Sequence, residues 1–168
     1  MIAYYSRKGM NYLNGRIVDL QEGNTAVAAG IIQKITGGDI FEIKTVKRYP
    51  ADYTEATEVA LSEKMHNQRP ALSAFVDNMA RYDVIILGYP NWWGTFPMAV
   101  FTFLEAYDLS GKSILPFCTH EGSGLGTSER DIRKLCPDVK IVPGLALRGG
   151  SVTNSVGTIQ TWLDKATR

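Results

Sequence analysis

The fold of this chain is decided by residues 83–97, Asp83-Val84-Ile85-Ile86-Leu87-Gly88-Tyr89-Pro90-Asn91-Trp92-Trp93-Gly94-Thr95-Phe96-Pro97. The first half is a short run of aliphatic and β-branched residues and predicts a buried strand. The second half is a turn that carries two tryptophans between two prolines, which stiffen it. In an open parallel sheet, ligands bind just beyond the carboxyl ends of the strands. The stretch therefore predicts a core strand that delivers flat aromatic rings to a ligand site.

Working outward from this stretch, apolar runs alternate with segments of helical period. The predicted strands are Ile2–Tyr5, Ile40–Ile43, Val84–Leu87, Ser113–Thr119 and Lys140–Leu147, and the predicted helices are Ala26–Ile35, Thr54–Asn67, Met98–Glu105, Ser128–Leu135 and Asn154–Lys165. This alternation predicts right-handed βαβ units, and hence an α/β domain with a parallel sheet between two helical layers. No linker or repeat interrupts residues 1–168, so a single domain is expected.

For two of these helices the sequence also predicts which residues face inward or cap the helix. The helix over 54–67 is polar, and Val59, Leu61 and Met65 are its predicted inner positions. The last helix begins at Asn154, which is a good N-cap residue.

One segment does not fit the alternation. Residues 8–21 are too many for a strand-to-helix turn, which takes about 2–6 residues. They contain Asn14-Gly15 between apolar neighbours, a strong hairpin signal. We expect an inserted hairpin or compact loop. It is either a surface elaboration or a flap over the ligand, because it leaves from the carboxyl edge of the first strand.

Composition excludes several classes of protein. The formal net charge is +1 with acids and bases interspersed, which gives no electrostatic footprint for nucleic acid. No apolar run is long enough for a membrane span, and the N-terminus lacks the features of a signal peptide. The two cysteines, Cys118 and Cys136, predict free thiols in a reducing compartment, and hence a cytoplasmic protein. No cluster has metal-ligand spacing, and the only histidines are His66 and His120.

Two loops beside the tryptophan turn also carry unusual chemistry. Ser6-Arg7 ends the first strand, and Gly23-Asn24-Thr25 opens the first helix, where free N–H groups and the helix dipole suit a phosphate. Asn and Thr are also ordinary capping residues. Residues 119–126, Thr-His-Glu-Gly-Ser-Gly-Leu-Gly, follow the fourth strand, and their glycines predict unusual dihedrals with exposed N–H groups. Together the loops suit a phosphorylated, planar, heteroatom-rimmed cofactor.

On these three motifs the chain resembles the flavodoxin-like superfamily over nearly its whole length, and most closely its branch of FMN-dependent NAD(P)H oxidoreductases. Flavodoxin itself is the standard example of a sheet ordered 2-1-3-4-5 with FMN at its switch point. The resemblance thus implies a flavodoxin-like three-layer sandwich with a five-stranded parallel sheet of that order, and FMN as the cofactor.

Carried over by position, the resemblance implies a role for each loop. The phosphate would be held by Ser6, Arg7, Gly23, Asn24 and Thr25; the isoalloxazine would be lined by Pro90, Asn91, Trp92, Trp93 and Gly94; and its pyrimidine side would meet Thr119, His120, Gly122, Ser123 and Gly124. Residues 8–21 split a phosphate loop that is usually continuous in the family. Glu22 falls where that loop often has a hydroxyl, so it should point away from the phosphate.

Three functions remain open at this point. An FMN oxidoreductase that passes electrons from NAD(P)H to a quinone or similar acceptor fits the near-neutral charge best. A flavodoxin-type electron carrier would benefit from a strongly acidic face, and a flavin-free binding domain of the same fold is the third alternative. His120 is the candidate for tuning the reduced flavin, with a loop-bracing hydrogen bond as its structural alternative. Reductases of this family often complete their sites between subunits, so the resemblance also allows a homodimer.

Overall fold

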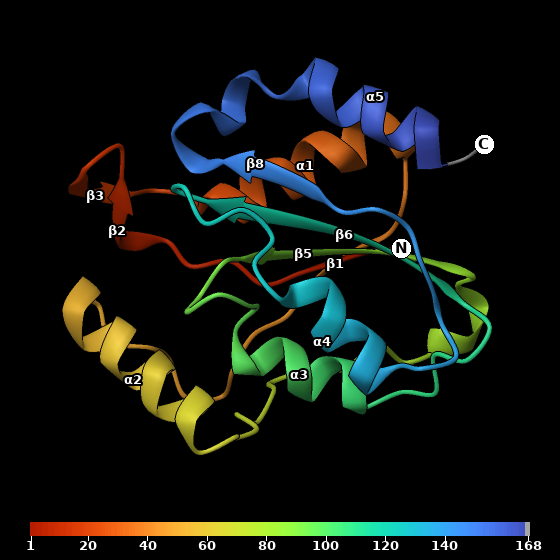
Figure 1. Ribbon diagram of the computed structural model, residues 1–168, viewed down its shortest axis with the longest axis horizontal. Coiled ribbons are helices and arrows are strands. Elements are labelled where there is room, and N and C mark those ends of the chain that lie inside the picture. Colours follow the sequence, from red (N-terminus) through yellow and green to blue (C-terminus); the bar gives the residue numbers. More distant parts are fainter. Residues whose placement is uncertain (167–168) are drawn as a thin grey trace.

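The central feature of the computed structural model, which describes residues 1–166, is a parallel sheet between two layers of helices (Figure 1). Its strands are β1 (Ile2–Tyr4), β4 (Ile40–Glu42), β5 (Val84–Pro90), β6 (Ser113–His120), β7 (Lys140–Ile141) and β8 (Leu145–Arg148). Their order is β4-β1-β5-β6, with β7 and β8 both paired to β6. This is the expected 2-1-3-4-5 order, with the fifth strand divided in two.

The division of the fifth strand corrects the expectation of one strand over Lys140–Leu147. Residues 142–144, Val-Pro-Gly, separate β7 from β8. Proline cannot donate to a strand ladder, and glycine adds little to one. The chain therefore leaves the sheet and rejoins it further along β6.

The helices are α1 (Asn24–Thr36), α2 (Tyr53–Met65), α3 (Met98–Glu105), α4 (Ser128–Leu135) and α5 (Val156–Ala166), with short 3₁₀ helices η1 (Met79–Arg81) and η2 (Gly149–Asn154). Figure 1 shows α1 and α5 on one face of the sheet and α3 and α4 on the other. Each face has its own core, because successive strand residues point to opposite sides. In β5, Ile85 and Leu87 face α3 and α4, whereas Ile86 faces α1 and α5.

Two helix expectations are corrected. Met65 is 73% exposed, and the buried positions of α2 are Ala56 and Ala60. Small residues four apart let this polar helix lie close to its neighbours. Asn154 belongs to η2 and does not cap α5, which begins at Val156.

The inserted segment is a β-hairpin of β2 (Gly9–Leu13) and β3 (Arg16–Leu20). Asn14 and Gly15 form its turn, and both have positive φ, which is the geometry that Asn-Gly pairs favour. In Figure 1 the hairpin stands apart from the central sheet, across from α2 at the end of the molecule where β1, β5 and β6 finish.

Gly88 lies at a tightly packed point of the sheet. It pairs with Phe117 across β5 and β6, and a Cβ there would lie 2.1 Å from the ring of this fully buried phenylalanine. Gly88→Ala is therefore expected to lower the free energy of unfolding by about 1–3 kcal/mol, the cost of overpacking. Urea denaturation measures this difference.

Gly30→Ala is the matched control, because a Cβ at this helical position meets nothing within 4 Å. It should raise stability by about 0.5–1 kcal/mol through helix propensity. Equal urea midpoints for Gly88→Ala and the unaltered protein would contradict the packing argument.

Candidate functional site

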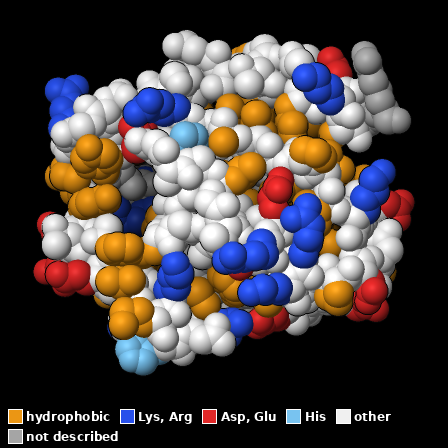
Figure 2. All heavy atoms as spheres, viewed as in Figure 1, with side chains coloured by type: hydrophobic (Ala, Val, Ile, Leu, Met, Phe, Trp, Pro, Cys, Tyr) orange, Lys and Arg blue, Asp and Glu red, His pale blue; other side chains and the backbone are white. Residues whose placement is uncertain are grey.

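A cavity of about 830 Å³ opens where the carboxyl ends of β1, β5 and β6 meet. Its volume lies within the range of about 300–1,000 Å³ typical of small-molecule sites. Figure 2 shows the surface hollowed on the side of the hairpin and α2, with hydrophobic side chains above and below the hollow. The three predicted loops contribute most of one side of this cavity, and the hairpin and α2 contribute the other.

The start of α1 presents free backbone donors to the cavity. Ser6 Oγ accepts the N–H of Ala26 at 3.1 Å, whereas the N–H groups of Asn24 and Thr25 have no partner among residues 1–166. Gly23 precedes the helix, and a Cβ there would lie 2.2 Å from Ser6 Oγ. Glycine is needed here because the end of β1 passes directly against the helix start. The result is a helix N-terminus with two open N–H groups and its positive dipole end.

A buried hydroxyl pair fixes this helix start to the sheet. Thr25 Oγ1 lies 2.7 Å from Thr119 Oγ1, and both residues are almost fully buried. Glu22 is exposed and does not line the cavity, which is the orientation expected of a carboxylate in this loop.

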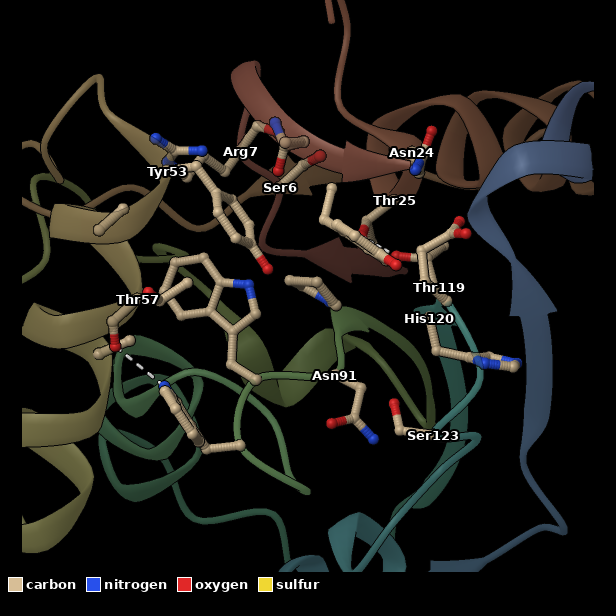
Figure 3. A pocket seen from close by; sticks show the side chains of 18 of the residues that line it. Ser6, Arg7, Asn24, Thr25, Tyr53, Thr57, Asn91, Thr119, His120 and Ser123 are labelled. Carbon is tan, nitrogen blue, oxygen red and sulfur yellow. Dashed lines mark hydrogen bonds between the residues drawn. The ribbon is translucent and has the colours of Figure 1, made fainter. Parts of the chain in front are cut away.

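Arg7 lies on the other side of Ser6, beside Tyr53 (Figure 3). Its guanidinium donates to the carbonyl oxygens of Pro50 at 2.7 Å and Ala51 at 2.9 Å, and also to that of Met10. These bonds join the base of the hairpin to the loop before α2. No carboxylate lies within ion-pair distance of Arg7 in the described chain. The arginine thus braces the cavity wall and brings a positive charge to it.

The tryptophan turn is tighter than an extended segment. Trp92 and Thr95 exchange backbone hydrogen bonds, and the two residues between them, Trp93 and Gly94, have φ of 55° and 86°. Both tryptophans line the cavity, although their rings have different surroundings. A bulky residue with positive φ is an outlier that local contacts must hold in place.

Each tryptophan is held differently. The Trp92 ring packs edge-on against Tyr5 and Tyr49, with centroid distances of 5.3 Å and 5.0 Å. Trp93 is 48% exposed, and its Nε1–H donates to the carbonyl oxygen of Thr57 on α2 at 2.9 Å, as Figure 3 draws. One ring therefore joins the core, and the other stands at the cavity mouth.

Asn91 fastens the tryptophan turn to the glycine-rich loop. Its Nδ2 donates to the carbonyl oxygen of Gly124 at 2.8 Å, and its Oδ1 accepts the N–H of Gly94 at 3.0 Å. Gly122, Gly124 and Gly126 all have positive φ, as their clustering predicts. The two loops consequently form one continuous edge of the cavity.

His120 is held as a neutral imidazole. Its Nδ1 accepts the N–H of Gly122 at 2.9 Å, so the remaining proton is on Nε2. Burial, and then the charge of Arg148, lower the pKa of His120 below its usual value. The loop-bracing hydrogen bond thus exists, and the ring still lines the cavity.

The hairpin and α2 supply a wall that the sequence motifs did not indicate. Its residues are Asn11, Tyr12 and Leu20 from the hairpin, and Tyr53, Ala56, Thr57 and Ala60 from α2. For α2, the signal in the sequence was a pair of alanines, Ala56 and Ala60, four residues apart in an otherwise polar helix. For the hairpin, the signal was its departure from the carboxyl edge of β1.

Glu121 holds the hairpin over the cavity. Its Oε2 accepts the N–H of Asn14 at the hairpin tip at 3.0 Å, and its Oε1 accepts the N–H of Gly150 in η2 at 2.9 Å. A Cβ at Gly150 would lie 2.2 Å from Asn14 Oδ1, so the tip and η2 are in close contact. One carboxylate therefore joins the glycine-rich loop, the hairpin and η2.

The structure brings most of the predicted site residues together in this one cavity. Those that line it are Ser6, Arg7, Asn24, Thr25, Pro90, Asn91, Trp92, Trp93, Thr119, His120, Gly122 and Ser123. The other three predicted residues, Gly23, Gly94 and Gly124, do not line the cavity but support residues that do. Gly23 lets Ser6 approach closely, Gly94 completes the turn at Trp93, and the carbonyl oxygen of Gly124 accepts a hydrogen bond from Asn91.

Three features are absent from residues 1–166: a membrane-spanning helix, a metal-binding cluster and a disulfide. No helix there is long and apolar enough to cross a membrane. No group of three or more His, Cys, Asp or Glu side chains is placed to hold a metal ion. Cys118 and Cys136 are both free and buried.

Solved structures with the same architecture include three that cover almost the whole chain. A proposed flavoprotein from Bacteroides eggerthii DSM 20697 is 29% identical, with a TM-score of 0.78, over 99% of this chain and 96% of that one. One from Bacteroides uniformis ATCC 8492 is 28% identical, with a TM-score of 0.74, over 98% and 96%. A flavoprotein from Lactobacillus acidophilus NCFM, solved in complex with FMN, is 21% identical, with a TM-score of 0.63, over 93% and 96%.

Comparison with curated protein sequences finds no match. The sequence model of the family described as Flavodoxin matches residues 20–166, which include α1, the tryptophan turn and the glycine-rich loop. The chain therefore belongs to the flavodoxin family.

Proposed function

We propose that the cavity binds FMN and that the protein is an FMN-dependent oxidoreductase. The observation that carries this proposal is the pair of free N–H groups at the start of α1, which open into the same cavity as the aromatic and glycine-rich loops. The cavity therefore offers sites for both parts of FMN, the anionic phosphate and the flat, polar isoalloxazine ring. Family membership and the 29% identity to a proposed flavoprotein support the same cofactor.

The phosphate belongs at the start of α1. The N–H groups of Asn24 and Thr25 are its donors there, and the helix dipole favours its charge. Ser6 Oγ lies at the same place, already accepting from Ala26, so its O–H is free to donate. Arg7 acts through its charge, because several of its N–H donors are committed to carbonyl oxygens.

The ring system belongs between the tryptophan turn and the glycine-rich loop. Aromatic rings prefer offset or edge contacts worth about 0.5–1.5 kcal/mol beyond the area they bury. Asn91 and the glycines with positive φ hold this edge in one conformation. Among these loops His120 offers an Nε2–H donor, and an anionic ligand beside it would raise its pKa from its lowered value.

When bound, FMN supplies the chemistry of accepting a hydride from NAD(P)H and passing two electrons on. The balanced reaction is NAD(P)H + quinone + H⁺ → NAD(P)⁺ + quinol. The protein contributes position and electrostatics, not a nucleophile. The formal charge of +1 favours this role over that of a carrier, because a carrier that docks basic redox proteins gains from an acidic face. The free, buried thiols are consistent with the reducing conditions of a cytoplasm.

Asn24→Asp tests the phosphate position. The change is isosteric and places a carboxylate at a helix start. Asn24 Nδ2 and Glu121 Oε1 both lie beside Gly149, so the comparison with riboflavin is needed to remove the effect of the new charge on Glu121. Beside a phosphate it should weaken FMN at least tenfold, because like charges about 4 Å apart repel strongly even near a protein surface. Riboflavin, which lacks the phosphate, should lose less than threefold. Quenching of flavin fluorescence measures both, and an equal loss for the two ligands would place the phosphate elsewhere.

Stopped-flow spectroscopy separates the reductase from the electron carrier. The FMN-loaded protein is mixed with NADH or NADPH, and loss of flavin absorbance is followed. We expect one nicotinamide to bleach the flavin within seconds and a quinone to restore the absorbance. Absence of bleaching by either nicotinamide would leave the carrier role, and absence of FMN binding would leave the flavin-free binding domain.

Glu121→Ala tests whether the hairpin is a flap. Loss of both acceptors should raise the hydrogen-exchange rate of the amides over residues 9–20 about tenfold in the flavin-free protein. FMN dissociation should accelerate in parallel. Asp19→Ala is the control, because this exposed hairpin carboxylate makes no side-chain bond in the described chain. Unchanged exchange in Glu121→Ala would make the hairpin a surface elaboration.

A further inference from the structure

One wall of the cavity has no part in the proposed cofactor contacts. The hairpin and α2 form it, and its side chains are those of Asn11, Tyr12, Leu20, Tyr53, Ala56, Thr57 and Ala60. It faces the aromatic and glycine-rich loops across the same cavity. The start of α2 in this wall is capped by Asp52, whose carboxylate accepts the N–H of Glu55 at 2.9 Å and disfavours an anion there, so the wall suits a ligand other than a phosphate.

Two tyrosines dominate this wall. Tyr12 on the hairpin and Tyr53 at the start of α2 have ring centroids 6.4 Å apart and planes tilted by 31°. Tyr12 is 44% exposed although it lines the cavity. Buried aromatic surface is a main source of binding energy for flat ligands. These two rings therefore offer a stacking surface for a planar molecule.

The hydroxyl of Tyr53 is an unused donor. No hydrogen bond is made by this O–H to any of the residues that the structure describes. Figure 3 shows the Tyr53 side chain reaching from α2 into the cavity. Burial, and then the neighbouring Tyr12, raise the pKa of Tyr53, so the hydroxyl stays protonated at neutral pH. A protonated phenol is suited to donate to a carbonyl oxygen.

The neighbours of these tyrosines keep the wall flat. Ala56 and Ala60 are buried and present only methyl groups. The Nε1–H of Trp93 is already bonded to the Thr57 carbonyl oxygen, so the indole closes the side of the wall as an apolar surface. Asn11 Nδ2 and Thr57 Oγ1 on this wall already donate to backbone oxygens, so the side-chain donors left for a ligand are the hydroxyls of Tyr53 and Tyr12.

We propose that this wall is the site of the second reactant, a planar aromatic carbonyl compound of the quinone class, with Tyr12 as its stacking surface and Tyr53 as the donor to its carbonyl oxygen. The inference rests on the proposed function for the identity of the flavin beside it. It adds Tyr12 and Tyr53 as specificity-determining residues. Neither the sequence motifs nor the family match indicates them.

The test measures binding without turnover. Anthraquinone-2-sulfonate and anthracene-2-sulfonate differ in the two carbonyl groups and share the sulfonate, so any effect of Arg7 on the charge cancels in their comparison. Both are titrated calorimetrically into the oxidised, FMN-loaded protein with no NAD(P)H present. We expect the anthraquinone to bind about fivefold more tightly, the contribution of one hydrogen bond.

The variants separate the two contacts. Tyr53→Phe should abolish the preference for the anthraquinone and leave anthracene-2-sulfonate within twofold of its original dissociation constant. Tyr12→Ala should weaken both probes about fivefold, because stacking does not depend on the carbonyl groups. Ile17→Ala is the matched control. It is the cross-strand partner of Tyr12, is 42% exposed and does not line the cavity, so both probes should bind unchanged.

Three results would overturn the inference. Retention of the anthraquinone preference in Tyr53→Phe removes the donor role. Equal weakening of both probes by Ile17→Ala and Tyr12→Ala shows a general loosening of the hairpin. Weakening of FMN by the tyrosine variants as much as of the probes makes this the flavin's own wall. Failure of the proposed function is seen separately. A protein that is not reduced by NAD(P)H is still titrated in its FMN-loaded form, and for a protein that does not bind FMN the same probes and variants are titrated in the flavin-free form.

Discussion

Parallel pairing of β1, β5 and β6 is the constraint on which the site depends. Parallel strands finish at the same edge, so Ser6, the tryptophan turn and the glycine-rich loop leave the sheet side by side. The register brings Pro90 opposite Thr119, and Thr119 in turn bonds Thr25 at the start of α1. Gly88 allows the strands to pair this closely around the ring of Phe117. The chemistry of the cavity follows from that shared edge.

The electrostatics of the cavity are consistent with an anionic ligand. Arg7 lacks a carboxylate partner, and the start of α1 adds a positive dipole end with two open donors. Among residues 1–166, Glu121 is the one carboxylate that lines the cavity, and it accepts the N–H groups of Asn14 and Gly150. Neutral His120 contributes a donor without a charge. Positive potential is thus concentrated at the start of α1 and at Arg7, whose guanidinium also borders the aromatic hairpin–α2 wall beside Tyr53.

The sequence was informative where a residue type has one main structural use. Alternating apolar runs predicted the parallel sheet between two helical layers, whereas its strand order came from the resemblance to flavodoxin. Asn14-Gly15 predicted the hairpin turn, because few other residues accept positive φ at both positions. The conformation of Trp93 could not be read in this way, since tertiary contacts with α2 and Gly94 hold it in a region that its side chain disfavours. Tyr53 and Ala56 line the cavity only because α2 packs against the loops. Contacts between distant segments leave no periodic signal in the chain.

The inserted hairpin separates Ser6 and Arg7 from Gly23 in the sequence, but not in space. Its strands pair with each other, so the chain returns after residue 20 to the point that it left at Arg7. The entropic cost of closing a loop rises only slowly with the loop's length. The hydrogen bonds between β2 and β3 offset part of that cost. Gly23 then passes within contact of Ser6, and Ser6 Oγ reaches the N–H of Ala26. The two halves of the motif are therefore adjacent in space, and the insertion adds Tyr12 and the Glu121-bound tip to the wall opposite.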